Sequence, residues 1–227
     1  MKKLPECAKC SIKPQERACR KEEGLGPDFC PTRFNKDGVE RALEEYREAG
    51  TREFARQASI QEAECYGDRE KQPFVRRPVK PRMEEISEFS RKMGYKRLGL
   101  AYCAGLQSEA ARFQNYLEGQ GFQVVSVVCK VGCTPKEEIG ITDAEKVRIN
   151  QFESMCSPIA QAEILNDAQT DFNVVLGLCV GHDSLFFKYS HAMSTVFAAK
   201  DRVLGHNPLA ALYTLGSYYE RLNREKP

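Results

Sequence analysis

Cysteine is the residue type whose spacing in this sequence most clearly predicts chemistry. The chain of 227 residues has ten cysteines, and four of them lie near its start, in a segment rich in Lys, Pro and Gly. Two residues separate Cys7 from Cys10, so both thiolates can bind one metal ion. Two further thiolates at loop distance complete a tetrahedral set. We therefore predict a metal site formed by Cys7, Cys10, Cys19 and Cys30.

The spacing after Cys10 leaves zinc and an iron–sulfur cluster both open as the metal at this site. Eight residues separate Cys10 from Cys19 and ten separate Cys19 from Cys30, so a second Cys-x2-Cys pair of a zinc ribbon is absent. The combination Cys30-Pro31 also occurs in ferredoxin-type cluster motifs. Residues 1–34 are too few to bury a core, so we expect this segment to depend on its metal. The alternative is a loose, partly oxidised tail.

Four further cysteines lie where predicted strands end or a predicted helix begins. Cys103, Cys129 and Cys179 each end an apolar run, and Cys156 directly precedes Ser157-Pro158, a typical helix start. Ligands of parallel sheets bind beyond the carboxyl ends of the strands. We expect these four cysteines to meet there and to bind an iron–sulfur cluster or a second metal, or to act as thiolates. Taken singly, each could equally be a small buried apolar residue.

The same edge of the sheet is expected to carry residues that move protons or bind anions. His182 follows Cys179 closely, and Lys200, Asp201 and His206 follow the next apolar run. Histidine ligates metals or transfers protons near neutral pH, and Lys200 could bind an anionic substrate. We predict His182, His206, Lys200 and Asp201 as catalytic residues. Neither a Gly-x-Gly-x-x-Gly fingerprint nor a P-loop occurs, so the sequence gives no support for nucleotide binding.

An alternation of helices and strands must position these residues. The apolar runs predict strands at 97–103, 122–129, 172–179 and 194–200. The predicted helices cover 36–65 (interrupted near Gly50), 83–94, 107–119, parts of 143–168, 183–191 and 208–222. Short apolar strands separated by helices are typical of an α/β fold with a three-layer parallel sheet, flavodoxin-like or Rossmann-like. We predict the strand order 2-1-3-4, and a last helix that buries Leu209, Leu212, Tyr213 and Gly216.

Composition divides the chain into four parts. Residues 1–34 form the cysteine-rich module, 35–70 a helical segment, 71–82 a linker, and 83–227 the α/β domain. The linker has three prolines within nine residues and five basic residues, so we expect it to be extended.

Charge and hydropathy exclude several classes of protein. The chain has 34 basic and 32 acidic residues, and this balance gives no electrostatic reason to expect nucleic acid or an anionic membrane as partner. It contains no apolar run of about 18 residues and no secretory signal. We therefore expect a cytoplasmic protein, in which ten reduced cysteines indicate metal or redox chemistry rather than disulfides. A small-molecule or redox partner and a homo-oligomer both remain open.

Several stretches of the chain resemble the DUF1847 family, a family of uncharacterised bacterial and archaeal proteins. The resemblance covers nearly the whole chain and is carried by the N-terminal cysteines and by Leu98–Cys103, Met155–Ile159, Gln161–Asn166, Val175–Phe186 and Lys200–Leu212. It implies metal at the four N-terminal cysteines and no established reaction. Two features depart from the family pattern: a longer gap between Cys10 and Cys19, and Ser157 in place of Asn.

Together these observations predict a metal-binding protein with a site for redox or sulfur chemistry at the edge of its sheet. One alternative is a non-catalytic metal carrier or sensor. The other is a small-molecule-binding domain stapled by structural zinc.

Overall fold

The computed structural model describes residues 4–224; residues 1–3 of the predicted N-terminal module and residues 225–227 of the predicted α/β domain lie outside the described residues. The chain divides into two compact units, one ending at Glu64 and the other beginning at Cys65. None of the helices in the described part combines the length and the apolar character needed to cross a lipid bilayer.

The first unit contains short helices around a cysteine-rich loop. Its elements are the 3₁₀ helices η1 (Cys7–Lys9) and η2 (Pro14–Glu16), and the α-helices α1 (Pro31–Phe34), α2 (Lys36–Glu45) and α3 (Ala49–Glu64). The predicted interruption near Gly50 is confirmed, because α2 ends at Glu45 and α3 begins at Ala49. Not one side chain is buried among the described residues up to 60, and Val39 and Leu43 of α2 stay half exposed. This unit therefore lacks a hydrophobic core of its own.

The second unit begins with a small antiparallel hairpin that precedes the main sheet. Strand β1 (Tyr66–Gly67) pairs with β2 (Arg77–Pro78), and α4 (Arg82–Lys92) follows. The segment expected as a linker, 71–82, thus contributes β2 and the first residue of α4.

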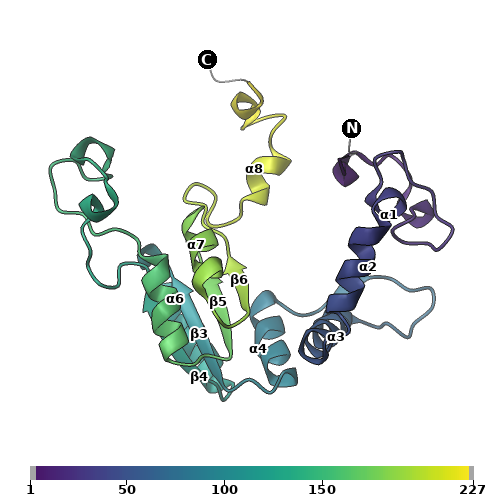
Figure 1. Ribbon diagram of the computed structural model, residues 1–227, viewed down its shortest axis with the longest axis horizontal. Helices are drawn as coiled ribbons and strands as arrows, with labels where there is room; N and C mark the ends of the chain where they lie inside the picture. The colour runs from purple at the N-terminus through teal and green to yellow at the C-terminus, as the bar shows by residue number, and fades with distance from the viewer. Residues whose placement is uncertain (1–3, 225–227) are drawn as a thin grey trace. The chain divides into compact units, whose positions relative to one another are not determined.

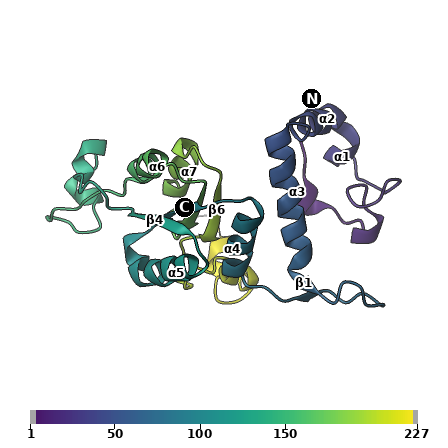
Figure 2. The same cartoon turned by 90° about the horizontal axis from the view of Figure 1, so that it is seen from below.

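A four-stranded parallel sheet forms the centre of the second unit. Its strands are β3 (Arg97–Tyr102), β4 (Gln123–Val128), β5 (Phe172–Leu176) and β6 (Ser194–Ala198), in the order β4-β3-β5-β6. All three pairings are parallel, so the predicted order 2-1-3-4 is confirmed. Helices α5 (Gln107–Gly119) and α4 cover one face, and α6 (Pro158–Asp167) and α7 (His182–Tyr189) cover the other (Figures 1 and 2).

The apolar runs become strands because both faces of the sheet are covered. Every residue of β5 is buried, and β3 is buried from Leu98 onwards. The centre is closely packed: Gly99 lies opposite Asn173 in the register, and a Cβ atom at position 99 would lie 1.9 Å from the Asn173 Oδ1. The buried Asn173 amide is satisfied by Thr170, which donates to its Oδ1, and by Ser190, which accepts from its Nδ2.

All four predicted strands are longer than the observed ones, and so is one predicted helical stretch. Strand β5 ends at Leu176, three residues before the predicted end at 179, because Gly177 adopts φ +65° and turns the chain. The helical segments predicted over 143–168 reduce to the 3₁₀ helix η5 (Asp143–Glu145) and to α6. The remainder of that crossover is a loop that projects away from the sheet (Figure 1).

The predicted last helix is wrong in length and in burial. Only α8 (Leu209–Tyr213) and the 3₁₀ helix η6 (Glu220–Asn223) form, joined by turns. The side chains expected to be buried are exposed, with exposed fractions of 52% for Leu209, 58% for Leu212 and 76% for Tyr213; Gly216 is exposed as well. An amphipathic pattern shows which residues share a helix face, but it does not establish that another element covers that face.

Candidate functional site

Cys103 and Cys129 lie opposite each other at the carboxyl ends of two neighbouring strands. Tyr102 of β3 pairs with Val128 of β4. The residues that follow them, Cys103 and Cys129, are therefore neighbours across the sheet. The Cys129 N–H donates to the Tyr102 carbonyl at 2.9 Å and continues the ladder by one bond. The Cys103 side chain packs against the buried cluster that contains Cys129, and the Ala104 N–H donates to the Cys129 sulfur at 3.3 Å. The register of the sheet thus brings these two sulfurs together.

Cys156 joins this pair from the crossover that leads into α6. The next residue, Ser157, donates its N–H to the Cys129 carbonyl at 2.7 Å, which fixes the start of the helix against the end of β4. The Cys156 and Cys129 side chains are hydrogen-bonded. Cys129 is buried, with 3% of its surface exposed, and lies between two partly exposed cysteines. We call Cys103, Cys129 and Cys156 the thiol row.

Gln161 of α6 holds the two strand ends that carry the thiol row. Its Nε2 donates to the Val127 carbonyl at 2.6 Å and to the Tyr102 carbonyl at 3.2 Å. The side chain is fully buried, and its Oε1 has no hydrogen-bond partner in the described part of the chain. A donor shared between β3 and β4 keeps the positions of Cys103 and Cys129 fixed relative to each other.

Cys103, at one end of the thiol row, is stabilised as a thiolate. The pKa of Cys103 is lowered to about 4, first by the hydrogen bond from Cys129 and then by the Gly105 backbone N–H and the Lys200 ammonium group, while burial opposes the shift. The same hydrogen bond, a second one with Cys156, and burial raise the pKa of Cys129. At neutral pH the row therefore holds a neutral Cys129 thiol that donates to a Cys103 thiolate.

Cys156 at the other end of the row is also acidic. Its pKa is lowered to about 6, chiefly by the hydrogen bond with Cys129, with contributions from the positive charges of Lys130 and His182. Burial and the negative charge of Cys103 act in the opposite direction. The arrangement can supply a nucleophilic sulfur, a neighbouring thiol and a proton acceptor.

The remaining residues predicted at this edge have different surroundings. The Cys179 sulfur accepts a hydrogen bond from Nη2 of Arg202 at 3.0 Å. His182 begins α7, and its buried Nδ1 has no partner among the described residues. Asp201 and His206 close a loop on each other: the Asp201 N–H donates to Nδ1 of His206 at 3.1 Å, and the His206 N–H donates to the Asp201 carbonyl at 2.9 Å.

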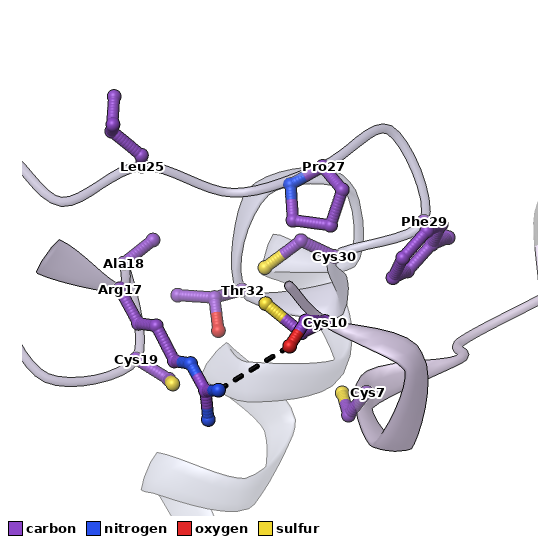
Figure 3. A pocket seen from close by; sticks show the side chains of 10 residues that line it. All are labelled: Cys7, Cys10, Arg17, Ala18, Cys19, Leu25, Pro27, Phe29, Cys30 and Thr32. Atoms are coloured by element: carbon purple, nitrogen blue, oxygen red, sulfur yellow. Dashed lines mark hydrogen bonds between the residues drawn. The ribbon is translucent and has the colours of Figure 1, made fainter. Parts of the chain in front are cut away.

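The four N-terminal cysteines line one cavity of about 90 Å³ in the first unit (Figure 3). Arg17 lies in its wall and donates from Nε to the Ile12 carbonyl at 2.7 Å and from Nη2 to the Cys10 carbonyl at 3.3 Å. Gly26 backs directly on Cys30, since a Cβ atom there would lie 2.9 Å from the Cys30 sulfur. The loop thus gathers Cys7, Cys10, Cys19 and Cys30 around one space.

The four sulfurs of this cavity are suitable ligands for a soft metal, but they lie too far apart to bind one ion in their present positions. All four cysteines are free thiols, and four thiolates are the typical ligand set of structural zinc or of an iron–sulfur cluster. Across residues 4–224, no three or more His, Cys, Asp or Glu side chains are grouped so that they could hold a metal ion as they stand. Metal binding would therefore require the loop to draw these sulfurs closer together.

Three residues of the site were missed by the sequence reasoning. Gln161 was quoted only as part of a sequence motif, and its bonds to the strand ends were not expected. Arg202 donates a hydrogen bond to the Cys179 sulfur. Lys130 donates from Nζ to the Ser154 carbonyl, in the loop that leads into α6. The available signal was position, because Lys130 directly follows Cys129 and Arg202 lies two residues after Lys200.

Comparison with known proteins gives a family and one close relative. Residues 30–197 match the sequence model of a family described as protein of unknown function DUF1847. The uncharacterized protein MJ0455 of Methanocaldococcus jannaschii is 41% identical over 184 residues, which cover 81% of this chain and 86% of the relative. No solved structure matches. The matched segment includes the whole thiol row and Cys179, whereas Cys7, Cys10 and Cys19 precede it.

Proposed function

The chain belongs to the DUF1847 family, and we propose that it is a metal-binding protein whose α/β domain performs redox or sulfur chemistry at the edge of its sheet. The metal would be zinc or an iron–sulfur cluster at the four N-terminal cysteines. The observation that carries the proposal is the thiol row, in which three cysteines pack together near Lys200. The comparisons assign no reaction, so the proposal depends on the residues of this chain.

The first unit supports metal binding because little else could hold it together. No side chain is buried between residues 4 and 60, and a segment without a core needs an added cross-link to fold. Four free thiols around one cavity could provide it, since metal binding contributes directly to the folding free energy of such segments. The Arg17 guanidinium group in the wall would offset part of the negative charge of four thiolates.

The sheet edge supports thiol chemistry because its cysteines differ in pKa and in exposure to solvent. The thiolate is the reactive form of cysteine, and it is favoured at Cys103 by a thiol, an N–H group and an ammonium group. Cys103 is partly exposed and Cys129 is buried, so a reagent from solution meets Cys103 first.

Metal analysis of protein purified without oxygen tests the first half of the proposal. Cys10→Ser should remove about one equivalent of metal and expose residues 1–34 to protease, because the metal holds the loop. Cys133→Ser is the matched control, since Cys133 is also an exposed free cysteine but lies outside the cavity. Brown colour with charge-transfer absorption would identify an iron–sulfur cluster, and colourless protein with bound zinc would identify structural zinc. Equal metal content and equal protease resistance in wild type and Cys10→Ser would refute the site.

Metal carriage is the second candidate function, favoured by the exposure of two of the four cysteines. Cys7 and Cys19 are exposed to solvent, and an acceptor could reach them while the metal is bound. Transfer of the metal to a competing chelator within seconds would favour a carrier, whereas retention over hours would favour a structural staple.

A further inference from the structure

The opposed positions of Cys103 and Cys129 define a chemical step for the sheet edge. We propose that these two cysteines form a reversible disulfide and thereby reduce small disulfides that carry a negative charge, with Cys103 as the attacking thiolate and Cys129 as the resolving thiol. The inference rests on the proposed thiol chemistry.

Register makes the disulfide accessible without rearrangement of the sheet. Neighbouring strands lie about 4.8 Å apart, and disulfides join Cα atoms about 4.4 to 6.8 Å apart. Cys103 and Cys129 follow directly on the paired residues Tyr102 and Val128. Cys103 packs against the buried cluster that contains Cys129, and the N–H of the next residue, Ala104, donates to the Cys129 sulfur at 3.3 Å. The backbone bond from Cys129 to Tyr102 and the two bonds from Gln161 hold this spacing.

Exposure assigns the order of the two cysteines. The Cys103 thiolate attacks one sulfur of the substrate, the substrate S–S bond breaks, and one substrate thiolate leaves. The Cys129 proton passes to the hydrogen-bonded Cys156 sulfur, and the Cys129 thiolate attacks the Cys103 sulfur and releases the second substrate thiolate. The Cys103 thiolate and the Cys129 thiol thus lose two electrons and one proton, which Cys156 takes up, and one substrate disulfide becomes two thiolates. An external dithiol reverses the protein step.

The structure also provides one hydrogen-bond donor for the sulfur that leaves when the protein disulfide is reduced. An external thiolate that attacks Cys103 expels Cys129, whose sulfur accepts the Ala104 N–H at 3.3 Å. The buried sulfur is therefore provided with a donor in its anionic form.

Two cations at this edge give the sign of the substrate charge. Lys200 lies near the Cys103 sulfur, since a Cβ atom at Gly105 would lie 3.9 Å from both the Cys103 sulfur and the Lys200 Nζ. Arg202 follows two residues later and contacts the Cys179 sulfur. The Lys200 ammonium group near the attacking sulfur, with the Arg202 guanidinium group on the neighbouring Cys179, favours a carboxylate-bearing disulfide over a cationic one.

The first experiment maps the disulfide in the full chain. Reduced, anaerobic wild type and variants are treated with glutathione disulfide, free thiols are alkylated, and peptides are identified by mass spectrometry. Wild type and Cys133→Ser should form the Cys103–Cys129 link and release two glutathiones per link. Cys129→Ser and Cys129→Ala should stop at a mixed disulfide on Cys103 with one glutathione released, and Cys103→Ser should form neither. Absence of the link in wild type, or a mixed disulfide that forms first on Cys129, would overturn the proposal.

The second experiment tests the charge of the substrate. Lys200→Met should slow the reaction with glutathione disulfide about fivefold, the effect of one ion pair in water. The same variant should leave the reaction with cystamine, a cationic disulfide, unchanged or faster, and Lys200→Arg should restore the glutathione rate. Equal losses with both disulfides would overturn the anionic assignment.

Metal content measured on the same samples separates the two proposals. An unreactive Cys103 in a protein that keeps metal in wild type and loses it in Cys10→Ser would refute the disulfide and leave the metal-binding proposal intact. An unreactive Cys103 in a protein without metal would refute both.

Discussion

Replacement of Gln161 by glutamate should make the stability of the second unit depend on pH. Gln161 is fully buried and donates to two strand carbonyls. A carboxylate at this position would lose both donors and face those carbonyls, so the folded state should keep it protonated, with a pKa that burial can raise to about 8. The unfolded chain releases the proton near pH 4.3, so stability should fall as pH rises above that value.

The size of the effect follows from this difference in proton binding. Each pH unit between about 4.3 and 7 removes about 1.4 kcal/mol, which gives a loss of about 3.5 kcal/mol at pH 7. Gln161→Leu should lack the slope and should lie within about 1 kcal/mol of wild type, because the loss of two donors is offset by removal of the unpartnered Oε1.

Urea unfolding followed by circular dichroism at several pH values between 5 and 7.5 measures these differences. The exposed Gln151→Glu serves as the control for an added carboxylate and should show no slope. If Gln161→Glu keeps a constant difference from wild type across this pH range, the description of Gln161 as a buried donor to both strands is wrong.

Three further predictions concern the same unit. Gly99→Ala should cost about 1 to 3 kcal/mol in urea unfolding, because its Cβ would meet the Asn173 Oδ1 at 1.9 Å; an unchanged midpoint would contradict the packing. Phe186→Ala should cost about 3 to 5 kcal/mol, since the ring is fully buried. Glu153 pairs with Lys136 at 2.7 Å, and this pair holds the pKa of Glu153 at about 2. Glu153→Gln should lower the melting temperature at pH 6, and the difference should fade as pH falls from 4.5 towards 2, where the wild-type carboxylate is protonated.

The arrangement of the sheet could be predicted because it follows from local patterns and general rules. Apolar runs at β3, β4, β5 and β6 are long enough to be buried on both faces, and helices between them require parallel pairing. The meeting of Cys103 and Cys129 follows from the same reasoning, because residues that directly follow paired strand ends lie side by side. These features depend on the period and length of the segments and not on loop conformation.

Features that depend on loops could not be predicted in the same way. Cys179 was placed at the end of a strand, but the turn at Gly177 ends β5 three residues earlier and brings Cys179 against Arg202. His206 was predicted as a ligand or acid/base residue, and the hydrogen bond that its Nδ1 accepts from the Asp201 N–H was not foreseen. Neither the positive φ of Gly177 nor the partner of a loop histidine is encoded in hydropathy.

The register that places Cys103 opposite Cys129 also constrains how this protein can change during evolution. Successive strand residues point to opposite faces, so inserting or deleting one residue within β3 or β4 would turn one sulfur to the other side of the sheet. Substitutions along either strand leave the two sulfurs opposed, whereas changes in strand length separate them. Lineages that use the thiol pair should therefore keep a constant number of residues in β3 and β4, and length variation should fall in loops such as the crossover before Cys156.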